Sequence, residues 1–164
     1  MSQEMNENIL KIIEKDSRLT PEEIAIMLGL EADEVAEAIK EMENRKVICG
    51  YHTLVNWEKA EDDEVSAVIE LKVNPQRGSG FDKIAERVYQ YPEVEAVYLM
   101  SGAYDLLVEM RKAPMKDIAS FVARRLSTIE EVQSTATHFI LKRYKDHGTL
   151  FVDDDEDKRM VVSP

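Results

Sequence analysis

The residues of this sequence best placed for binding chemistry are Ser101-Gly102-Ala103 and Asp105, which follows two positions later. β-Rich runs within 94–110 lie on both sides of this segment, and they predict a hairpin with a tight glycine-containing turn. Glycine lets a backbone approach another group closely, and Asp105 adds a fixed negative charge just past the turn. We expect the elements on either side to be built to present this turn.

The period of the apolar residues predicts the elements around the turn. Alternation from Val65 to Val73 predicts a strand, and the spacing of Ile84, Ala85 and Val88 predicts a helix that ends before Pro92. The hairpin comes next. A second helix after Pro114 carries Met115, Ile118, Ala119, Val122 and Leu126, and a last strand is expected from Glu131 to Tyr144.

This order of strand, helix, strand, strand, helix and strand predicts an α+β domain, a ferredoxin-like βαββαβ sandwich. The two halves resemble each other, because the Ile-Ala-x-x-Val pattern at 84–88 returns at 118–122. Both helices of such a sandwich pack on one face of the sheet. The Val, Leu and Met residues of the other face predict dimerisation through it.

The N-terminal third has the local signals of a helix-turn-helix. Residues 7–16 carry apolar side chains at helical spacing, and Thr20-Pro-Glu-Glu23 is a capping box that starts a second helix. Gly29 is the preferred residue just past a helix end, and a third helix with Val35, Ala38, Ile39 and Met42 follows. Residues 47–51 and 54–55 are then expected to form the strands of a wing.

These patterns predict four parts of the chain. We expect a winged helix-turn-helix at 1–55, a hinge at 56–63, the ferredoxin-like domain at 64–145 and an acidic tail at 146–164. The tail lacks the glycine of a calcium-binding EF-hand loop, so we interpret it as a solvated segment. The Gly-x-Gly of residues 78–80 lacks the third glycine of a nucleotide-binding motif.

Composition limits the classes of function. A net charge of −12 does not indicate nucleic-acid binding, although a local basic patch is what decides it. The single cysteine, Cys49, excludes an intrachain disulfide and lies in an apolar run that favours a core position. Without a leader or a long apolar run, the chain is expected to be cytoplasmic, with no membrane partner.

Five motifs in this order resemble the Lrp/AsnC family of transcriptional regulators over roughly residues 5–145. They are Ile9-Leu10-x-x-Ile13 with Asp16-x-Arg18-Leu-Thr20, Ala25-x-x-Leu28-Gly29-Leu30, Ile48-x-Gly50-Tyr51, Gly102-Ala-Tyr-Asp105, and Ser134-Thr-Ala-Thr137. The resemblance implies a homodimer, which in many members assembles into an octamer. It also implies two partners, double-stranded DNA and a small-molecule effector such as an amino acid.

By position, the resemblance implies an effector site made by the turn and the last strand. Its residues are Met100, Ser101, Gly102, Tyr104, Asp105, Ser134, Thr135 and Thr137. Backbone N–H groups near Gly102 are expected to hold an α-carboxylate, and Asp105 an α-ammonium. The alternative is structural: Gly102 only makes the turn, and Asp105 only caps it.

The expected DNA-reading third helix departs from the family pattern, because it is acidic where family members carry Ser, Thr and basic residues. Such acids would repel phosphates. The residues expected to contact DNA are Arg18, Thr20, Lys40, Arg45, Lys46, Tyr51 and His52. Our hypothesis is that binding is weak per dimer and depends on octamer avidity.

The sequence leaves two alternatives open. One is a metabolite-sensing oligomer that has lost DNA binding, which the acidic helix favours. The other is an enzyme like the sirohaem decarboxylases of similar architecture, which would need histidines around a large pocket. Only His52, His138 and His147 are present, without metal-ligand spacing or a nucleophile motif. The sequence therefore predicts no catalytic residue, no metal and no cofactor.

Overall fold

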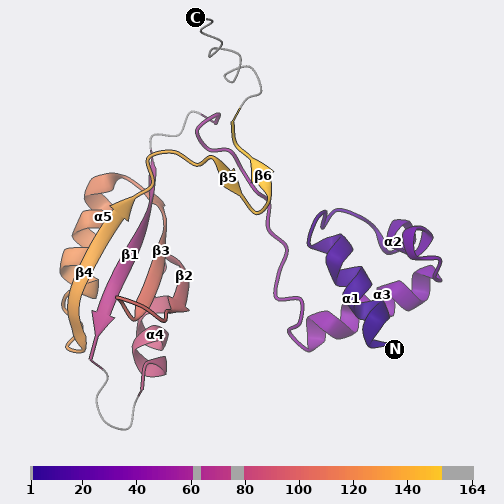
Figure 1. The fold of residues 1–164 in the computed structure, drawn as a ribbon, viewed down its shortest axis with the longest axis horizontal. Coiled ribbons are helices and arrows are strands. Elements are labelled where there is room, and N and C mark those ends of the chain that lie inside the picture. The colour runs from indigo at the N-terminus through magenta and orange to yellow at the C-terminus, as the bar shows by residue number, and fades with distance from the viewer. Residues whose placement is uncertain (1, 61–63, 75–79, 153–164) are drawn as a thin grey trace, which may run out of the picture. The chain divides into compact units, whose positions relative to one another are not determined.

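The computed structural model describes residues 2–60, 64–74 and 80–152. It divides into two compact units, Met1–Val55 and Asn56–Pro164, shown in Figure 1. Residues 75–79, with most of the Gly-x-Gly segment, and the acidic run 153–157 lie outside the described residues. No helix in the described parts of the chain has both the length and the apolar character to cross a membrane.

The first unit is a bundle of α1 (Gln3–Ile13), α2 (Pro21–Leu28) and α3 (Ala32–Asn44). The predicted capping box is present: Glu23 N–H donates to Thr20 Oγ1, and Thr20 N–H donates to the Glu23 carboxylate. Gly29 ends α2 in the left-handed conformation at φ 68°, as predicted. The unit's core includes Ile9, Ile24, Val35, Ala38 and Met42.

The predicted wing strands are wrong, because no residue of 47–55 belongs to a strand. Lys46 turns the chain at φ 59° after α3, and the N–H groups of Val47 and Ile48 both donate to the Met42 carbonyl. A strand needs a pairing partner, and this segment has none in the described chain. Cys49 is exposed rather than in the core.

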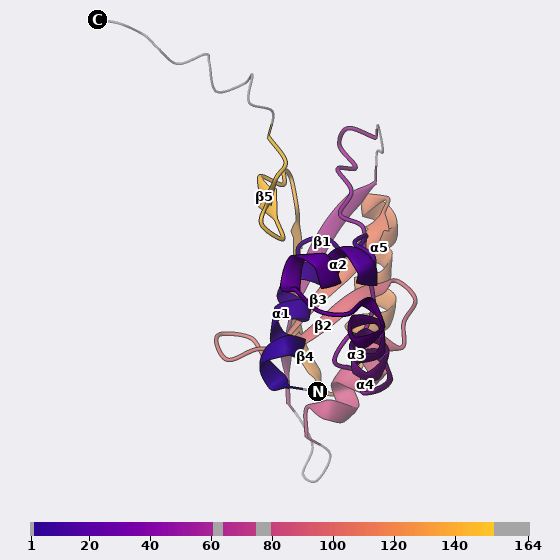
Figure 2. The same ribbon diagram turned by 90° about the vertical axis from the view of Figure 1, so that its right-hand side faces the viewer.

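The second unit is built on a four-stranded antiparallel sheet in the order β2-β3-β1-β4. Its strands are β1 (Val65–Val73), β2 (Val94–Leu99), β3 (Leu106–Ala113) and β4 (Val132–Phe139). The helices α4 (Asp82–Tyr89) and α5 (Met115–Phe121), followed by the π-helical turn η1 (Val122–Leu126), cover one face (Figure 2). The α+β prediction of a helix-turn-helix joined to a ferredoxin-like sandwich is confirmed.

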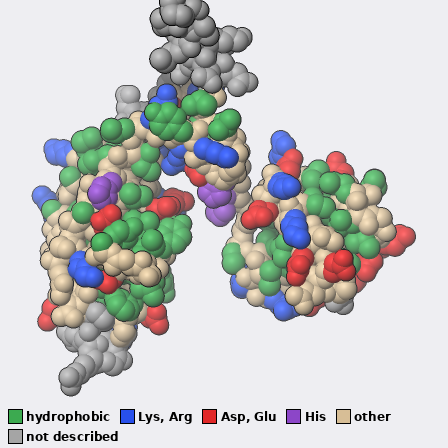
Figure 3. Space-filling view, viewed as in Figure 1, with side chains coloured by type: hydrophobic (Ala, Val, Ile, Leu, Met, Phe, Trp, Pro, Cys, Tyr) green, Lys and Arg blue, Asp and Glu red, His purple; other side chains and the backbone are tan. Residues whose placement is uncertain are grey.

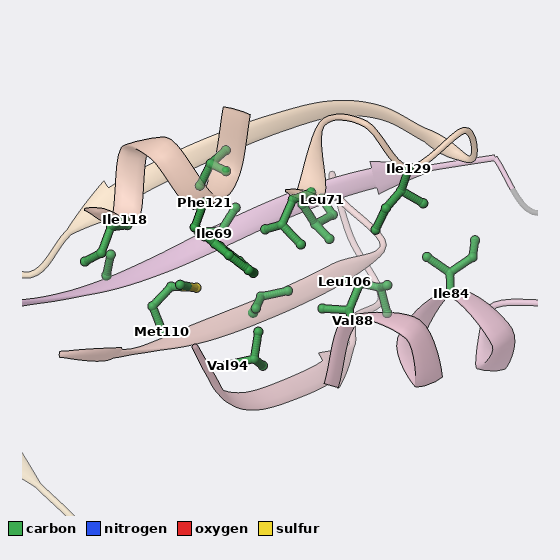
Figure 4. Packing of buried hydrophobic residues seen from close by; sticks show 14 of the residues in the cluster. Ile69, Leu71, Ile84, Val88, Val94, Leu106, Met110, Ile118, Phe121 and Ile129 are labelled. Atoms are coloured by element: carbon green, nitrogen blue, oxygen red, sulfur yellow. The ribbon is translucent and has the colours of Figure 1, made fainter. Parts of the chain in front are cut away.

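Figure 4 shows the core of this unit between the sheet and its helices. The inward residues of β1 alternate as predicted, with Ile69 and Leu71 fully buried. Ile84 and Val88 of α4 and Ile118 of α5 meet them from the helix layer. Each such side chain contributes about 1.5–3 kcal/mol to folding through burial of apolar surface.

The second helix differs from the single helix predicted after Pro114. It changes into a π-helical turn at Val122, where Ser127 N–H donates to the Val122 carbonyl at 2.9 Å. The wider turn keeps Val122 and Leu126 buried. Met115, one of the apolar residues from which this helix was predicted, is 52% exposed.

The last strand is shorter than predicted, because it ends at Phe139 rather than Tyr144. A separate hairpin, β5 (Lys145–Asp146) and β6 (Thr149–Leu150), follows it. Its two-residue turn, His147 and Gly148, has positive φ at both positions, 42° and 79°. Positive φ at both central residues is typical of a type I′ turn, whose twist matches that of the two strands it joins.

The first residues of the expected hinge are attached to the second unit. The ammonium of Lys112 lies 4.9 Å from the centre of the Trp57 ring, and Arg143 N–H donates to the Glu58 carboxylate at 3.3 Å. Residues 56–60 are thus held by contacts to β3 and to the chain after β4.

The sheet face without helices is less apolar than the sequence suggested. Strand register places Val68, Leu107 and Tyr98 on it, but Met110 points into the core. Polar residues lie among the apolar ones: His138 Nε2 is 3.4 Å from the Glu70 carboxylate. The face therefore combines an apolar centre with a histidine–carboxylate pair.

Candidate effector site and nucleic-acid interface

The connection between β2 and β3 is longer than the tight turn predicted. β2 ends at Leu99 and β3 begins at Leu106, which leaves a six-residue loop, 100–105. It is closed by the Met100 N–H, which donates to the Asp105 carbonyl at 2.8 Å. Gly102 does not have a positive φ, and a Cβ there would meet no described atom within 4 Å. Within one protomer, the loop therefore does not require glycine.

Asp105 is the fixed point of this loop. Its N–H donates to the Leu71 carbonyl at 3.0 Å, and its carboxylate accepts from Val73 N–H at 2.9 Å and from Lys72 Nζ at 3.2 Å. The Val73 N–H, and secondly Lys72, hold the pKa of the Asp105 carboxyl below its ordinary value. The carboxylate is thus ionised and oriented at the end of β1.

The middle of the loop has unused hydrogen-bond donors. The N–H groups of Ser101, Gly102, Ala103 and Tyr104 donate to no acceptor in the described part of the chain. Residues 101–103 are exposed and Tyr104 is half-buried. Free amides next to a fixed carboxylate give the loop both donors and an acceptor, as a ligand with two opposite charges requires.

The three β4 residues predicted to form one wall lie on two faces of the sheet. Ser134 pairs with Lys72, whereas Thr135 pairs with the buried Leu71 and Thr137 with the buried Ile69. Neighbouring side chains of a strand point to opposite faces. Ser134 is therefore beside Lys72 on the open face, and the two threonines point toward the helix layer.

Two residues at this site were missed from the sequence: Lys72, through its ammonium, and Val73, through its N–H. Alternation along β1 did place Lys72 opposite the buried set. No local signal, however, connects it with a carboxylate that lies 33 positions further along the chain. Antiparallel pairing of β1 with β3 is what brings the two together.

The residues expected to contact DNA begin with Arg18 and Thr20. The Arg18 guanidinium donates to both oxygens of Asp16 at 2.8 Å, and these hydrogen bonds lower the pKa of Asp16 to about 2. Its side chain is otherwise open to solvent, at 88% exposure. Thr20 Oγ1 is used in the capping box. The arginine charge is thus exposed but already neutralised by a neighbour.

The C-terminal end of α3 repeats this arrangement. Arg45 Nη1 lies 3.5 Å from the Glu41 carboxylate, and Tyr51 donates its hydroxyl to Glu43 at 2.8 Å. Burial, and then the Glu43 carboxylate, raise the pKa of the Tyr51 hydroxyl. Lys40 and Lys46, by contrast, have no acidic partner among the described residues, and His52 is exposed.

Acids dominate the exposed surface of α3. Asp33, Glu34, Glu37 and Glu41 are all exposed, against Lys40 as the only exposed cation within this helix. In Figure 3 the visible face of this unit shows red acidic and blue basic side chains intermixed. The acidic surface that the sequence indicated for α3 is therefore present in the structure. In addition, two of the cations expected to contact DNA, Arg18 and Arg45, are paired with acids.

No cluster of three or more His, Cys, Asp or Glu side chains that could hold a metal occurs in the described ranges. The three histidines are distributed over separate elements. His52 follows α3, His138 is on β4, and His147 forms the turn of the β5–β6 hairpin.

Comparison with known proteins gives the same two-part division. Residues 66–150 match the model of the Lrp/AsnC ligand binding domain, and residues 4–48 match a winged helix-turn-helix DNA-binding model. The chain is 49% identical over 162 residues to the uncharacterised HTH-type transcriptional regulator YugG of Bacillus subtilis. That alignment covers 98% of both chains.

Solved structures also share the fold. The transcriptional regulator NMB0573 of Neisseria meningitidis, in complex with L-Met, superimposes with a TM-score of 0.70 at 22% identity, covering 89% of this chain and 94% of the other. A feast or famine regulatory protein of M. tuberculosis complexed with L-methionine gives a TM-score of 0.69 at 22% identity, covering 88% and 95%. At this identity the likeness establishes the fold.

Proposed function

Because the chain belongs to the Lrp/AsnC family of transcriptional regulators, we propose that it binds double-stranded DNA through its first unit. We further propose that a free amino acid bound at loop 100–105 changes that binding. The chain is a transcriptional regulator with a helix-turn-helix and an Lrp/AsnC ligand-binding domain. A DNA-binding regulator acts in the compartment that contains the DNA. This agrees with the cytoplasmic location expected from the sequence.

The observation that carries the effector proposal is the geometry of the loop. Asp105 offers an ionised carboxylate, and the amides of 101–104 offer unused donors a few residues away. A free amino acid has an ammonium group that can bind the carboxylate and a carboxylate group that can bind the amides. The L-methionine bound in two structural relatives supports this class of effector. Ser134 faces the same side as Lys72, so we keep it in the proposed site and place Thr135 and Thr137 behind it.

For DNA we propose contacts from the free cations Lys40 and Lys46, with Arg18 and Arg45 contributing when their acidic partners release them. Affinity for DNA depends mainly on cations that displace counterions from phosphates. With two cations already paired to acids, each dimer is expected to bind weakly. A homodimer formed through the open sheet face, and an octamer built from it, would multiply that affinity.

The acidic surface of α3 favours a second candidate, a sensing oligomer without a DNA role. Both candidates are tested by incubating the purified protein with fragmented genomic DNA at low salt, with and without a mixture of amino acids, and sequencing the retained fragments. Discrete enriched sites, changed by the mixture, are the expected result. A folded protein that enriches nothing in either condition would favour the second candidate.

A further inference from the structure

We propose that Lys72 recognises the α-carboxylate of a free amino acid, and that its ion pair with Asp105 opens to admit that ligand. The ligand's ammonium would then lie against Asp105 and its carboxylate against Lys72 and the loop amides. This inference rests on the proposed effector function, because it concerns the same loop. It adds a residue, and it restricts the ligand to molecules that carry both charges.

The side chains of Lys72 and Asp105 differ in how freely they can move. Asp105 is fixed by three backbone contacts: its N–H to Leu71, its carbonyl to Met100 and its carboxylate to Val73. Its side chain is only 18% exposed, whereas that of Lys72 is 42% exposed. A lysine ammonium sits on a flexible four-carbon stem. The cation can therefore move away while the anion stays in place.

Charge balance decides which ligand can open the pair. A partly buried carboxylate that loses its only cation is destabilised, so the pair stays closed without a replacement. The ammonium of an amino acid is such a replacement, and its carboxylate in turn supplies a new partner for Lys72. In an α-amino acid these groups share one carbon and lie about 3 Å apart. A ligand whose ammonium is held at Asp105 therefore presents its carboxylate within reach of the flexible Lys72 side chain, whose ammonium lies 3.2 Å from Asp105 Oδ1 while the pair is closed.

In the described part of the chain, Asp105 is the acid paired with Lys72. Glu70, two positions earlier on the same face, lies 3.4 Å from His138 Nε2 instead. Across the strand pair, Lys72 faces the neutral Ser134. A ligand with an ammonium but no carboxylate would therefore displace Lys72 from Asp105 and leave it beside a second cation, without an anionic partner. The site is expected to prefer free amino acids over their esters and amides.

The test is a calorimetric titration of the full chain with each of the twenty L-amino acids, and then with the methyl ester of the tightest binder. The variants are Lys72→Gln, Lys72→Met, Lys72→Arg and, as a control on α5, Lys116→Gln. Lys72→Gln and Lys72→Met should weaken the free amino acid by about tenfold or more, since a charged hydrogen bond is lost. The ester, which has no carboxylate to lose, should bind these variants at least as tightly as the wild type, because the cation that competes for Asp105 is gone.

Lys72→Arg, which keeps the charge, should retain most of the affinity, and Lys116→Gln all of it. Circular dichroism of each variant checks that the fold is kept. Lys72→Gln and Lys72→Met proteins that bind the amino acid as the wild type does, or that lose ester and amino acid equally, would overturn the inference alone. If no amino acid binds the folded wild-type chain, the proposed effector function fails, and this inference with it.

Discussion

Arg18 turns back onto Asp16, two positions earlier, and its Nε and Nη2 each donate to a carboxylate oxygen at 2.8 Å. Asp16 also accepts from the Arg18 N–H at 3.1 Å. The arginine nearest the start of α2 is thus neutralised by its own chain. A phosphate that approached Arg18 would have to compete with a carboxylate that is already in place.

Asp16→Asn should therefore strengthen DNA binding. The change releases the guanidinium and removes a negative charge, so one further phosphate contact becomes available. A plot of log K against log salt should become steeper by about 0.9 for that contact. Glu14→Gln removes a negative charge two positions away without releasing Arg18, and it should leave this slope unchanged. Equal slopes for both variants would show that Arg18 does not reach the DNA.

Stability should depend on pH through Asp105. Because Val73 N–H and Lys72 lower the pKa of the folded carboxyl below its ordinary value of 3.8, the ionised form is favoured by folding. The stabilisation is fully present above that ordinary value, and it is lost as pH falls through the lower folded pKa. Asp105→Asn should thus reduce the free energy of unfolding more at pH 7 than in strong acid.

Chemical denaturation of wild type and variant at several pH values measures this difference. Glu130→Gln, which changes an exposed carboxylate, is the control. An Asp105→Asn difference that stays constant from neutral to acid pH would contradict the proposed role of the ionised carboxylate in folding.

A substitution at the cap of α2 can distinguish a role of Thr20 in folding from a role in DNA contact. Thr20→Ala removes the acceptor for Glu23 N–H and should destabilise the first unit by about 1 kcal/mol. Its DNA affinity, measured where the unit is still folded, should not change, because Oγ1 is already used in the cap. Thermal unfolding and fluorescence titration measure the two quantities. Weakened binding by a fully folded Thr20→Ala protein would restore Thr20 to the DNA-contact surface.

Features with local signals were predictable. The capping box, the turn at Gly29 and the alternation along β1 each depend on residues a few positions apart, and the structure contains all three. Together they give the order of the elements and hence the fold. The strands predicted at 47–55 failed because apolar, β-prone residues form a strand only where another strand pairs with them.

The site was less predictable than the fold, because it depends on pairing between distant segments. Asp105 was singled out as a charge, but its partners Lys72 and Val73 come from β1. The register of β4 likewise decides that Ser134 shares a face with Lys72 while Thr135 does not. A shift of one position would exchange those faces, and the sequence motif alone does not specify the register.

The open face of the sheet should carry the dimer contact, and Leu107 is the residue to test. It lies opposite Tyr98 on one side and Glu70 on the other, at the apolar centre of that face. Leu107→Lys would place a charge where a partner sheet is expected to pack, so it should shift the protein from dimer toward monomer. Leu99→Lys makes the same chemical change at a 62% exposed position whose register belongs to the other face. Sedimentation of both variants over a range of concentrations measures the shift, and a Leu107→Lys protein that dimerises as tightly as Leu99→Lys would exclude this face as the interface.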